Sequence, residues 1–315
     1  GLLRSLVGSE RSIRDRYITT RGINYSVVNM ALNGGKGDVV AGKKNLPLLT
    51  TTPECQFENI AAIRKPGMDE YWLIHSAVNS TSSAIEYYVW DMTDAGISAT
   101  PVKYTFPTTN IPIQNAPNGP IGTLKFSAGG SRFVSLMNNS TANVIASGLF
   151  DAENGIVSDV HVRKNAGIDL FGYSSEFSPS GDHVFISSVE NKSYYISWND
   201  LHNTTNKVVN LQKPVSNWQI NSDGRIYGIR ANARDLYVIM EPEQGGDSEI
   251  RRFANYLSSG TQAMAGLPTF SPSFMALAGD PYFCVKTIRE FTMTVTPYVG
   301  TTQVSYSQWD FGDGT

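Results

Sequence analysis

The sequence predicts an all-β protein, and three observations support this fold class. Short runs rich in Val, Ile, Tyr, Phe and Thr recur between clusters of Gly, Asn, Asp and Pro, which is typical of antiparallel strands joined by turns. Apolar residues at helical spacing are nearly absent. The chain has 315 residues and a hydrophobic fraction of 41%, so it is long enough to bury a large core.

One local pattern occurs four times: an apolar residue, three further residues that are mostly small or polar, a glycine and then an apolar strand. The four copies are Ile63–Gly67, Phe126–Gly130, Phe177–Gly181 and Ile220–Gly224. Each copy is followed by a second apolar strand that ends on an acidic residue or Asn, and these strand ends are Asp91, Asp151, Asn199 and Glu241. An earlier copy of this second strand, Ser26–Asn29, has no partner hairpin upstream.

Two hairpins make a four-stranded unit, and such units repeating at roughly 40 to 50 residues are typical of the blades of a β-propeller. A blade must stack on its neighbours to bury both faces, so several blades are needed around a ring. We therefore expect residues 1–285 to form a β-propeller. Because rings of six or seven blades are the usual ones, we expect part of the ring to be missing upstream.

The pattern changes after Lys286. The run Phe291–Thr296 alternates apolar and polar residues strictly, as an antiparallel strand with one wet face does. Asp313-Gly314 is a strong turn dipeptide, and Trp309 and Phe311 would share one face of a strand. We therefore expect residues 286–315 to begin an immunoglobulin-like β-sandwich, which is incomplete because such a domain takes about 100 residues.

These residues resemble a family of large secreted proteins from gliding and related Gram-negative bacteria, in which a propeller precedes tandem PKD repeats. The stretches that match are Leu32–Val39, Asp69–Ile74, Glu176–Gly181, Asp223–Tyr227 and Gly266–Phe270, together with Trp309–Thr315, which is similar to the PKD motif. The resemblance implies export by the type IX secretion system and a location outside the cell or at the outer-membrane surface.

Charge and hydropathy exclude two classes of partner. A net charge of −3 gives no basic footprint for nucleic acid, which requires clustered Lys and Arg against the phosphates. No apolar stretch approaches the ~20 residues that a membrane-spanning helix needs. The sequence therefore predicts no nucleic-acid partner and no transmembrane segment.

Residues that could carry chemistry show no catalytic arrangement in the sequence. The histidines have no short metal-ligand spacing, and they are His75, His161, His183 and His202. The Gly-rich run Asn33–Asp38 predicts a hairpin turn, because no Ser or Thr follows Lys36 and no helix follows the run. No Gly-x-Ser-x-Gly nucleophile motif is present. We therefore expect no catalytic residue, no cofactor and no metal ligand.

Other polar and aromatic residues receive structural interpretations. The acidic residues at hairpin ends are interpreted as turn formers, and they are Asp91, Asp94, Asp151, Glu153, Glu241 and Glu243. We expect the strand tryptophans to pack between blades, and they are Trp72, Trp90, Trp198 and Trp218. Asp310 and Asp313 could face a cation or shape the PKD turn. Cys55 and Cys284 are either buried thiols or one disulfide.

The sequence thus predicts a non-enzymatic extracellular module for adhesion or protein–protein interaction. Its partner would be a protein or polysaccharide at the cell surface, or a component of the secretion system. Two alternatives stay open. One is a glycan-active hydrolase or lyase with its site in the central channel of the propeller. The other is a structural component of the secretion or gliding machinery.

Overall fold

The structure is a computed structural model of the whole chain. It describes residues 3–8, 23–49, 55–79, 83–108, 122–139, 142–164, 172–188, 190–202, 208–264 and 266–267. The chain divides into two compact units, 1–281 and 282–315, and all described residues lie in the first. The domain expected at 286–315 is therefore outside the described residues, as are Asp310, Asp313 and Cys284.

The first unit contains five antiparallel sheets among its described residues. The first sheet consists of β1 (Leu3–Gly8), β2 (Ile23–Asn29), β3 (Asp38–Val39) and β4 (Leu46–Leu49). The second consists of β5 (Cys55–Arg64), β6 (Tyr71–Asn79), β7 (Ala84–Thr93), β8 (Gly96–Ile97) and β9 (Val102–Pro107). The third consists of β10 (Leu124–Phe126), β11 (Arg132–Asn139), β12 (Ala142–Asp151) and β13 (Ile156–Lys164). The fourth consists of β14 (Gly172–Phe177), β15 (His183–Ser188), β16 (Ser193–Ser197) and β17 (Val209–Asn210). The fifth consists of β18 (Asn217–Ile220), β19 (Ile226–Ile229), β20 (Leu236–Ile239) and β21 (Ile250–Phe253).

The repeated sequence pattern forms the first hairpin of the second to fifth sheets. The apolar residue that opens each copy pairs across the hairpin with a residue of the next strand. These pairs are Ile63 with Trp72, Phe126 with Phe133, Phe177 with Val184, and Ile220 with Ile226. The prediction of repeated antiparallel four-stranded units is therefore confirmed for the third, fourth and fifth sheets, whereas the second sheet has five strands because both β8 and β9 pair with β7.

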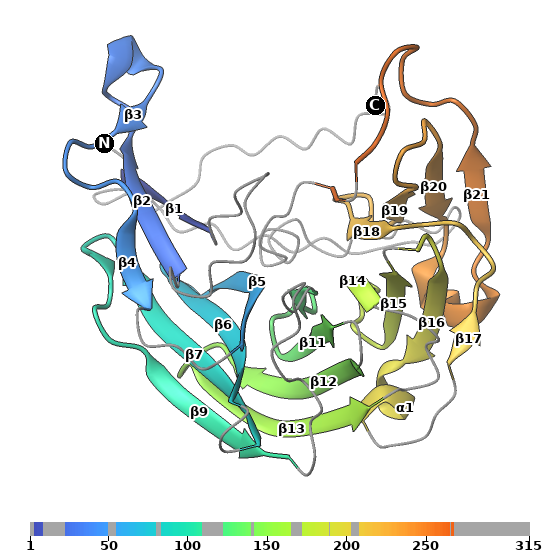
Figure 1. Cartoon of the computed structure of the whole chain (residues 1–315), viewed down its shortest axis with the longest axis horizontal. Coiled ribbons are helices and arrows are strands. Elements are labelled where there is room, and N and C mark those ends of the chain that lie inside the picture. The colour runs from blue at the N-terminus through green and yellow to red at the C-terminus, as the bar shows by residue number, and fades with distance from the viewer. Residues whose placement is uncertain are drawn as a thin grey trace, which may run out of the picture. The chain divides into compact units, whose positions relative to one another are not determined.

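Each sheet packs its apolar face on the next sheet in chain order (Figure 1). Four apolar clusters make these joints, and the large buried side chains at them include Trp90, Phe133, Phe177 and Trp218 in that order. The first strands β5, β14 and β18 lie on the inner side of this arrangement, and the last strands β9, β13, β17 and β21 lie on its outer side. This stacking is the blade arrangement of a propeller. The described residues provide five blades, and the expected six or seven stays a prediction.

Two local features differ from the sequence expectations. The strand Ser26–Asn29 was expected to lack a partner hairpin upstream, and among the described residues one upstream strand, β1 (Leu3–Gly8), pairs with β2. The segment Ile196–Asn199 was expected to end as a strand, but a helix, α1 (Trp198–His202), begins there. Trp198 therefore lies on a helix, although it is buried between sheets as expected. The hairpin expected at Asn33–Asp38 is present as a 3₁₀ turn (Asn33–Gly35) between β2 and β3.

Among the residues that the structure describes, no helix has the length and apolar character needed to cross a membrane.

Candidate metal centre

Helix α1 begins where the sequence places a capping pair. Ser197 Oγ accepts the backbone N–H of Asp200 at 3.0 Å and donates to Asp200 Oδ2 at 2.8 Å. A Ser that caps the residue three positions later satisfies a backbone donor that the first turn of a helix leaves without a partner. The Asp carboxylate also lies in the first turn, where the helix dipole favours negative charge. The chain therefore leaves β16 as a helical turn rather than a hairpin.

The helix is held against the third sheet by side chains of both sheets. The Trp198 ring contacts the Phe177 ring, with centroids 5.9 Å apart. The Arg132 guanidinium lies 5.4 Å from the centroid of the Trp198 ring. On β13 the guanidinium of Arg163 donates to the backbone carbonyl of Asp200. Trp198 also stacks on His202, one turn later in the helix, with centroids 4.8 Å apart. These contacts fix the end of α1, and hence His202, above strand β13.

Strand β13 carries an irregularity at the point that faces this helix end. Ser147 pairs with His161 and Leu149 pairs with Ser158, so Asp159 and Val160 together oppose Gly148. Asp159 has a φ of 49°, a left-handed conformation that Asp tolerates better than most residues. A Cβ on Gly148 would lie 2.4 Å from the Phe133 ring, so only glycine fits opposite the bulge. A bulge of this kind redirects side chains locally.

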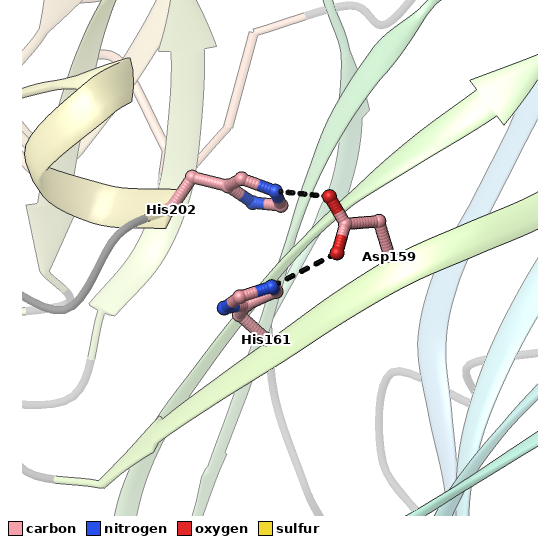
Figure 2. A group of neighbouring side chains, drawn as sticks. All are labelled: Asp159, His161 and His202. Atoms are coloured by element: carbon pink, nitrogen blue, oxygen red, sulfur yellow. Dashed lines mark hydrogen bonds and ion pairs between the residues drawn. The ribbon is translucent and has the colours of Figure 1, made fainter.

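The helix end and the bulge bring Asp159, His161 and His202 together (Figure 2). His202 Nε2 lies 3.0 Å from Asp159 Oδ2, and His161 Nε2 lies 3.0 Å from Asp159 Oδ1. The two imidazole rings have centroids 4.3 Å apart. The carboxylate therefore bridges two histidines, one from the third sheet and one from the connection of the fourth sheet.

The three side chains differ in their access to solvent. The side chains of Asp159 and His161 are 52% and 37% exposed, whereas that of His202 is 10% exposed. Hydrogen bonds from His202, and then from His161, hold the pKa of Asp159 below its usual value. Asp159 is thus a carboxylate at neutral pH. A ligand bound here would be held by one buried residue and two residues open to water.

These residues fit a divalent transition metal such as zinc. One carboxylate and two histidines are ligands that zinc uses in catalytic sites, with bonds of about 2.0 to 2.2 Å. The three ligand atoms lie within 4.8 Å of one another, and the exposed Asp159 and His161 side chains can rotate to close this distance. Three protein ligands leave a fourth position for water, which is the difference between a catalytic and a structural zinc site.

A serine completes a chain of contacts that resembles a nucleophile triad but does not function as one. Ser147 Oγ lies 3.1 Å from His202 Nδ1, and Asp159 is on the opposite nitrogen of the same ring. Ser147 is 1% exposed, so its hydroxyl cannot attack a substrate. Its contact with His202 instead helps to fix the orientation of that ring.

The two remaining histidines do not join this group. His75 is fully buried in β6, and its Nδ1 lies 2.9 Å from the carbonyl of Asn59. Burial lowers the pKa of His75 to about 4. His183 begins β15 and contacts the Tyr195 hydroxyl at 2.8 Å. His75 and His183 therefore make polar contacts outside this group.

Of the acidic residues at hairpin ends, Asp151 has the expected turn-forming role, whereas Asp91 pairs with Lys65 and Glu243 makes a contact between sheets. Asp151 accepts the backbone N–H groups of Glu153 and Asn154, which is the role of a turn-forming Asp. Glu243 accepts from the backbone and hydroxyl of Ser180 and joins the fifth sheet to the fourth. The proposed partner cysteine of Cys55 lies outside the described residues, so the alternative of thiols or a disulfide stays open.

No family model matches the sequence, and no curated protein is similar to it. Among solved structures, the chain is similar to a periplasmic gluconolactonase, PpgL, from Pseudomonas aeruginosa. The identity is 14% and the TM-score 0.49, over 82% of this chain and 70% of that one. At this identity and TM-score the likeness assigns no activity or substrate to this chain.

The similar solved structure is that of an enzyme, which runs against the expectation of a non-enzymatic binding and display module without assigning an activity to this chain. One physical basis of that expectation was the missing metal-ligand spacing. The fold supplies what the spacing lacks, since it brings together Asp159 and His202, which are 43 positions apart. The centre also lies on an outer strand and a connection, not in the central channel where the enzymatic alternative placed it.

Two signals in the sequence could have pointed to this centre. Asp159-x-His161 places two ligands on one face of a strand, since side chains alternate with a period of two. Ser197-x-x-Asp200 is a capping pattern that marks a helix start four residues before His202. Neither signal shows that the two segments meet.

Proposed function

We propose that this chain is a metal-dependent hydrolase whose centre is formed by Asp159, His161 and His202. The observation that carries the proposal is the two-histidine, one-carboxylate group with its ligand atoms within 4.8 Å of one another and two of its members open to solvent. A zinc ion held this way lowers the pKa of a bound water to about 7, which supplies a nucleophile at neutral pH.

The number of carboxylates favours one class of hydrolysis over another. Glycosidases that cleave the acetal bond generally use a pair of carboxylic residues, one of them as an acid for the leaving group. This centre contains one carboxylate, Asp159, and that residue is engaged by both histidines. A metal-activated water suits an ester carbonyl, which needs a nucleophile and a Lewis acid. We therefore propose a carboxylic ester as the bond cleaved.

The glycan-active alternative of the sequence analysis is retained in this narrower form. The substrate would be an acyl ester carried by a polysaccharide, and the carbohydrate part of this proposal rests on the resemblance to secreted surface proteins. The exposed position of Asp159 and His161 suits a long substrate that lies across the surface.

The test begins with metal content. The whole chain is stripped with a chelator and dialysed against zinc, and bound metal is measured by mass spectrometry together with hydrolysis of an aryl acetate and an acetylated polysaccharide. We expect one zinc per chain and zinc-dependent release of acetate. His161→Ala removes a ligand that is exposed, so it should abolish both without unfolding the protein. His183→Ala is the matched control, because it removes an imidazole outside the centre.

Two results would overturn the proposal. If the stripped chain takes up no zinc, the group is a carboxylate bridge between two histidines and not a metal centre. If zinc binds and raises the melting temperature but neither ester is cleaved above the background rate, the ion joins the third and fourth sheets without catalysis.

A further inference from the structure

Both ring nitrogens of His202 have polar partners in a buried setting. Nε2 lies 3.0 Å from Asp159 Oδ2, and Nδ1 lies 3.1 Å from Ser147 Oγ. Ser147 is on β12, where it pairs with His161 across the sheet. It is 1% exposed and His202 is 8% exposed, so water competes little for these contacts.

In the metal-free protein, the partner of Nε2 decides where the proton of a neutral His202 ring sits. A carboxylate accepts hydrogen bonds and donates none, so Nε2 must carry the proton in its contact with Asp159. A neutral imidazole has one N–H, and Nδ1 is then an acceptor. The Ser147 hydroxyl must donate to Nδ1 in this state.

Metal binding at Nε2 would reverse this arrangement. A metal on the Nε2 side would take the lone pair of Nε2, so the proton of the neutral ring would have to be on Nδ1. The proton on Nε2 would leave to solvent and another would be taken up at Nδ1, so the ring would stay neutral. Ser147 Oγ would then accept from Nδ1. A hydroxyl serves both states because it can rotate from donor to acceptor, whereas a carboxylate or a carbonyl would only accept.

We propose that Ser147 is the positioning residue of this centre: its hydroxyl reverses its hydrogen bond with His202 Nδ1 and lets that ring change tautomer when metal binds. The inference rests on the proposed function because both require a metal at this centre. It does not depend on the reaction that the metal catalyses.

The experiment follows the ring nitrogens directly. The whole chain is labelled with ¹⁵N-histidine, and long-range proton–nitrogen spectra are recorded without metal and with one equivalent of zinc. His202 is assigned with His202→Gln. We expect the Nε2–H tautomer without metal and the Nδ1–H tautomer with zinc.

Substitution of Ser147 tests whether its hydroxyl supports the change of tautomer at His202. Ser147→Ala should weaken zinc binding 10-fold to 100-fold in a chelator competition, which is the usual effect of losing a residue that supports a metal ligand. Ser147→Thr keeps a hydroxyl and should retain most of the affinity. Ser216→Ala is the matched control, because it deletes a buried hydroxyl just before β18 that donates to the Ile229 carbonyl. It should leave zinc affinity unchanged.

The outcomes separate this inference from the proposed hydrolase. If zinc binds and the tautomer changes but no ester is cleaved, the hydrolase fails and the inference stands. If His202 has the same tautomer with and without zinc, or Ser147→Ala binds zinc as tightly as the unaltered chain, Ser147 does not have this role. If zinc does not bind at all, both are wrong.

Discussion

The third and fourth sheets connect their last two strands in different ways. In the third sheet a tight turn joins β12 to β13, with the N–H of Gly155 donating to the Asp151 carbonyl at 2.7 Å. The backbone of this turn docks on the second sheet, where Trp72 Nε1 donates to the Ala152 carbonyl at 2.8 Å. In the fourth sheet α1 follows β16 and docks on the third sheet through the side chains of Trp198 and His202.

Both connections therefore dock on the preceding sheet, but only one of them brings side chains that can bind a ligand. The turn presents backbone carbonyls to a tryptophan, which stabilises the joint and offers no further chemistry. The helix presents an imidazole to a strand that already carries Asp159 and His161. The repeated scaffold is common to both joints, and the candidate function arises where a connection departs from the repeat.

Removing the docking tryptophan of the helix should have the largest effect. Trp198→Ala deletes a buried ring that packs on Phe177 and His202, so we expect a loss of about 4 kcal/mol in the free energy of unfolding, measured by urea titration. The zinc affinity should also fall, because His202 loses the Trp198 ring that stacks on it. Trp72→Ala is the control at the other joint. It should also destabilise the protein but leave zinc affinity unchanged, and an equal loss of affinity in both variants would contradict the comparison.

His75 on β6 is a buried histidine that has no charged partner among the described residues. Burial holds the pKa of His75 at about 4, below its ordinary value of 6.5. The unfolded chain therefore binds the proton first, so the free energy of unfolding should fall as the pH decreases from 6.5 to 4 and then stop responding to this group. The shift corresponds to about 3 kcal/mol over that range.

Chemical denaturation in a chelator from pH 7 to pH 4 measures this slope. His75→Gln should remove the part of the slope that His75 contributes, whatever the stability of the variant, whereas His183→Gln should retain that part. If His75→Gln keeps the full slope, the acid sensitivity belongs to other groups and the burial of His75 is not its cause.

One added methyl group should destabilise the contact between the β12–β13 turn and the second sheet. Gly155 has a φ of +70°, and a Cβ there would lie 3.0 Å from three atoms of the Trp72 ring. We expect Gly155→Ala to lower the free energy of unfolding by about 2 kcal/mol, from the strained backbone and the contact together. Gly67 has a φ of +69° with nothing within 4 Å, so Gly67→Ala isolates the backbone part. Equal losses in thermal or urea unfolding would show that the turn does not depend on its contact with Trp72.

The sequence predicts the repeated part of this fold well because its rules are local. Period-two alternation and turn glycines placed the hairpins around Gly130, Gly181 and Gly224, and the structure confirms them. The strand β1 was missed, because Leu3–Gly8 carries no turn signal that ties it to β2. The blade number depends on ring closure, which no single repeat encodes.

The candidate centre was missed for a different reason. A rule based on short ligand spacing detects neighbours on one strand or helix, but His202 reaches Asp159 only because α1 docks on another sheet. The bulge at Asp159 depends in turn on Phe133 covering Gly148, a contact between different strands. Such tertiary contacts are set by packing and not by spacing along the chain.

The smallest change we consider removes the cap that starts the helix. Ser197→Ala deletes the hydroxyl that accepts the Asp200 N–H, and loss of such a cap lowers the free energy of unfolding by about 1 kcal/mol. Trp198 and the Arg163 contact to the Asp200 carbonyl remain, so α1 should stay docked with a less well ordered first turn. We therefore expect zinc affinity to fall only several-fold, far less than for Trp198→Ala. Ser197→Thr retains a capping oxygen and should restore both stability and affinity. If Ser197→Ala instead abolishes zinc binding, the capping hydroxyl and not Trp198 positions His202. The difference between the helical connection and the turn would then lie in the cap that starts the helix, and not in the side chains that dock it on the third sheet.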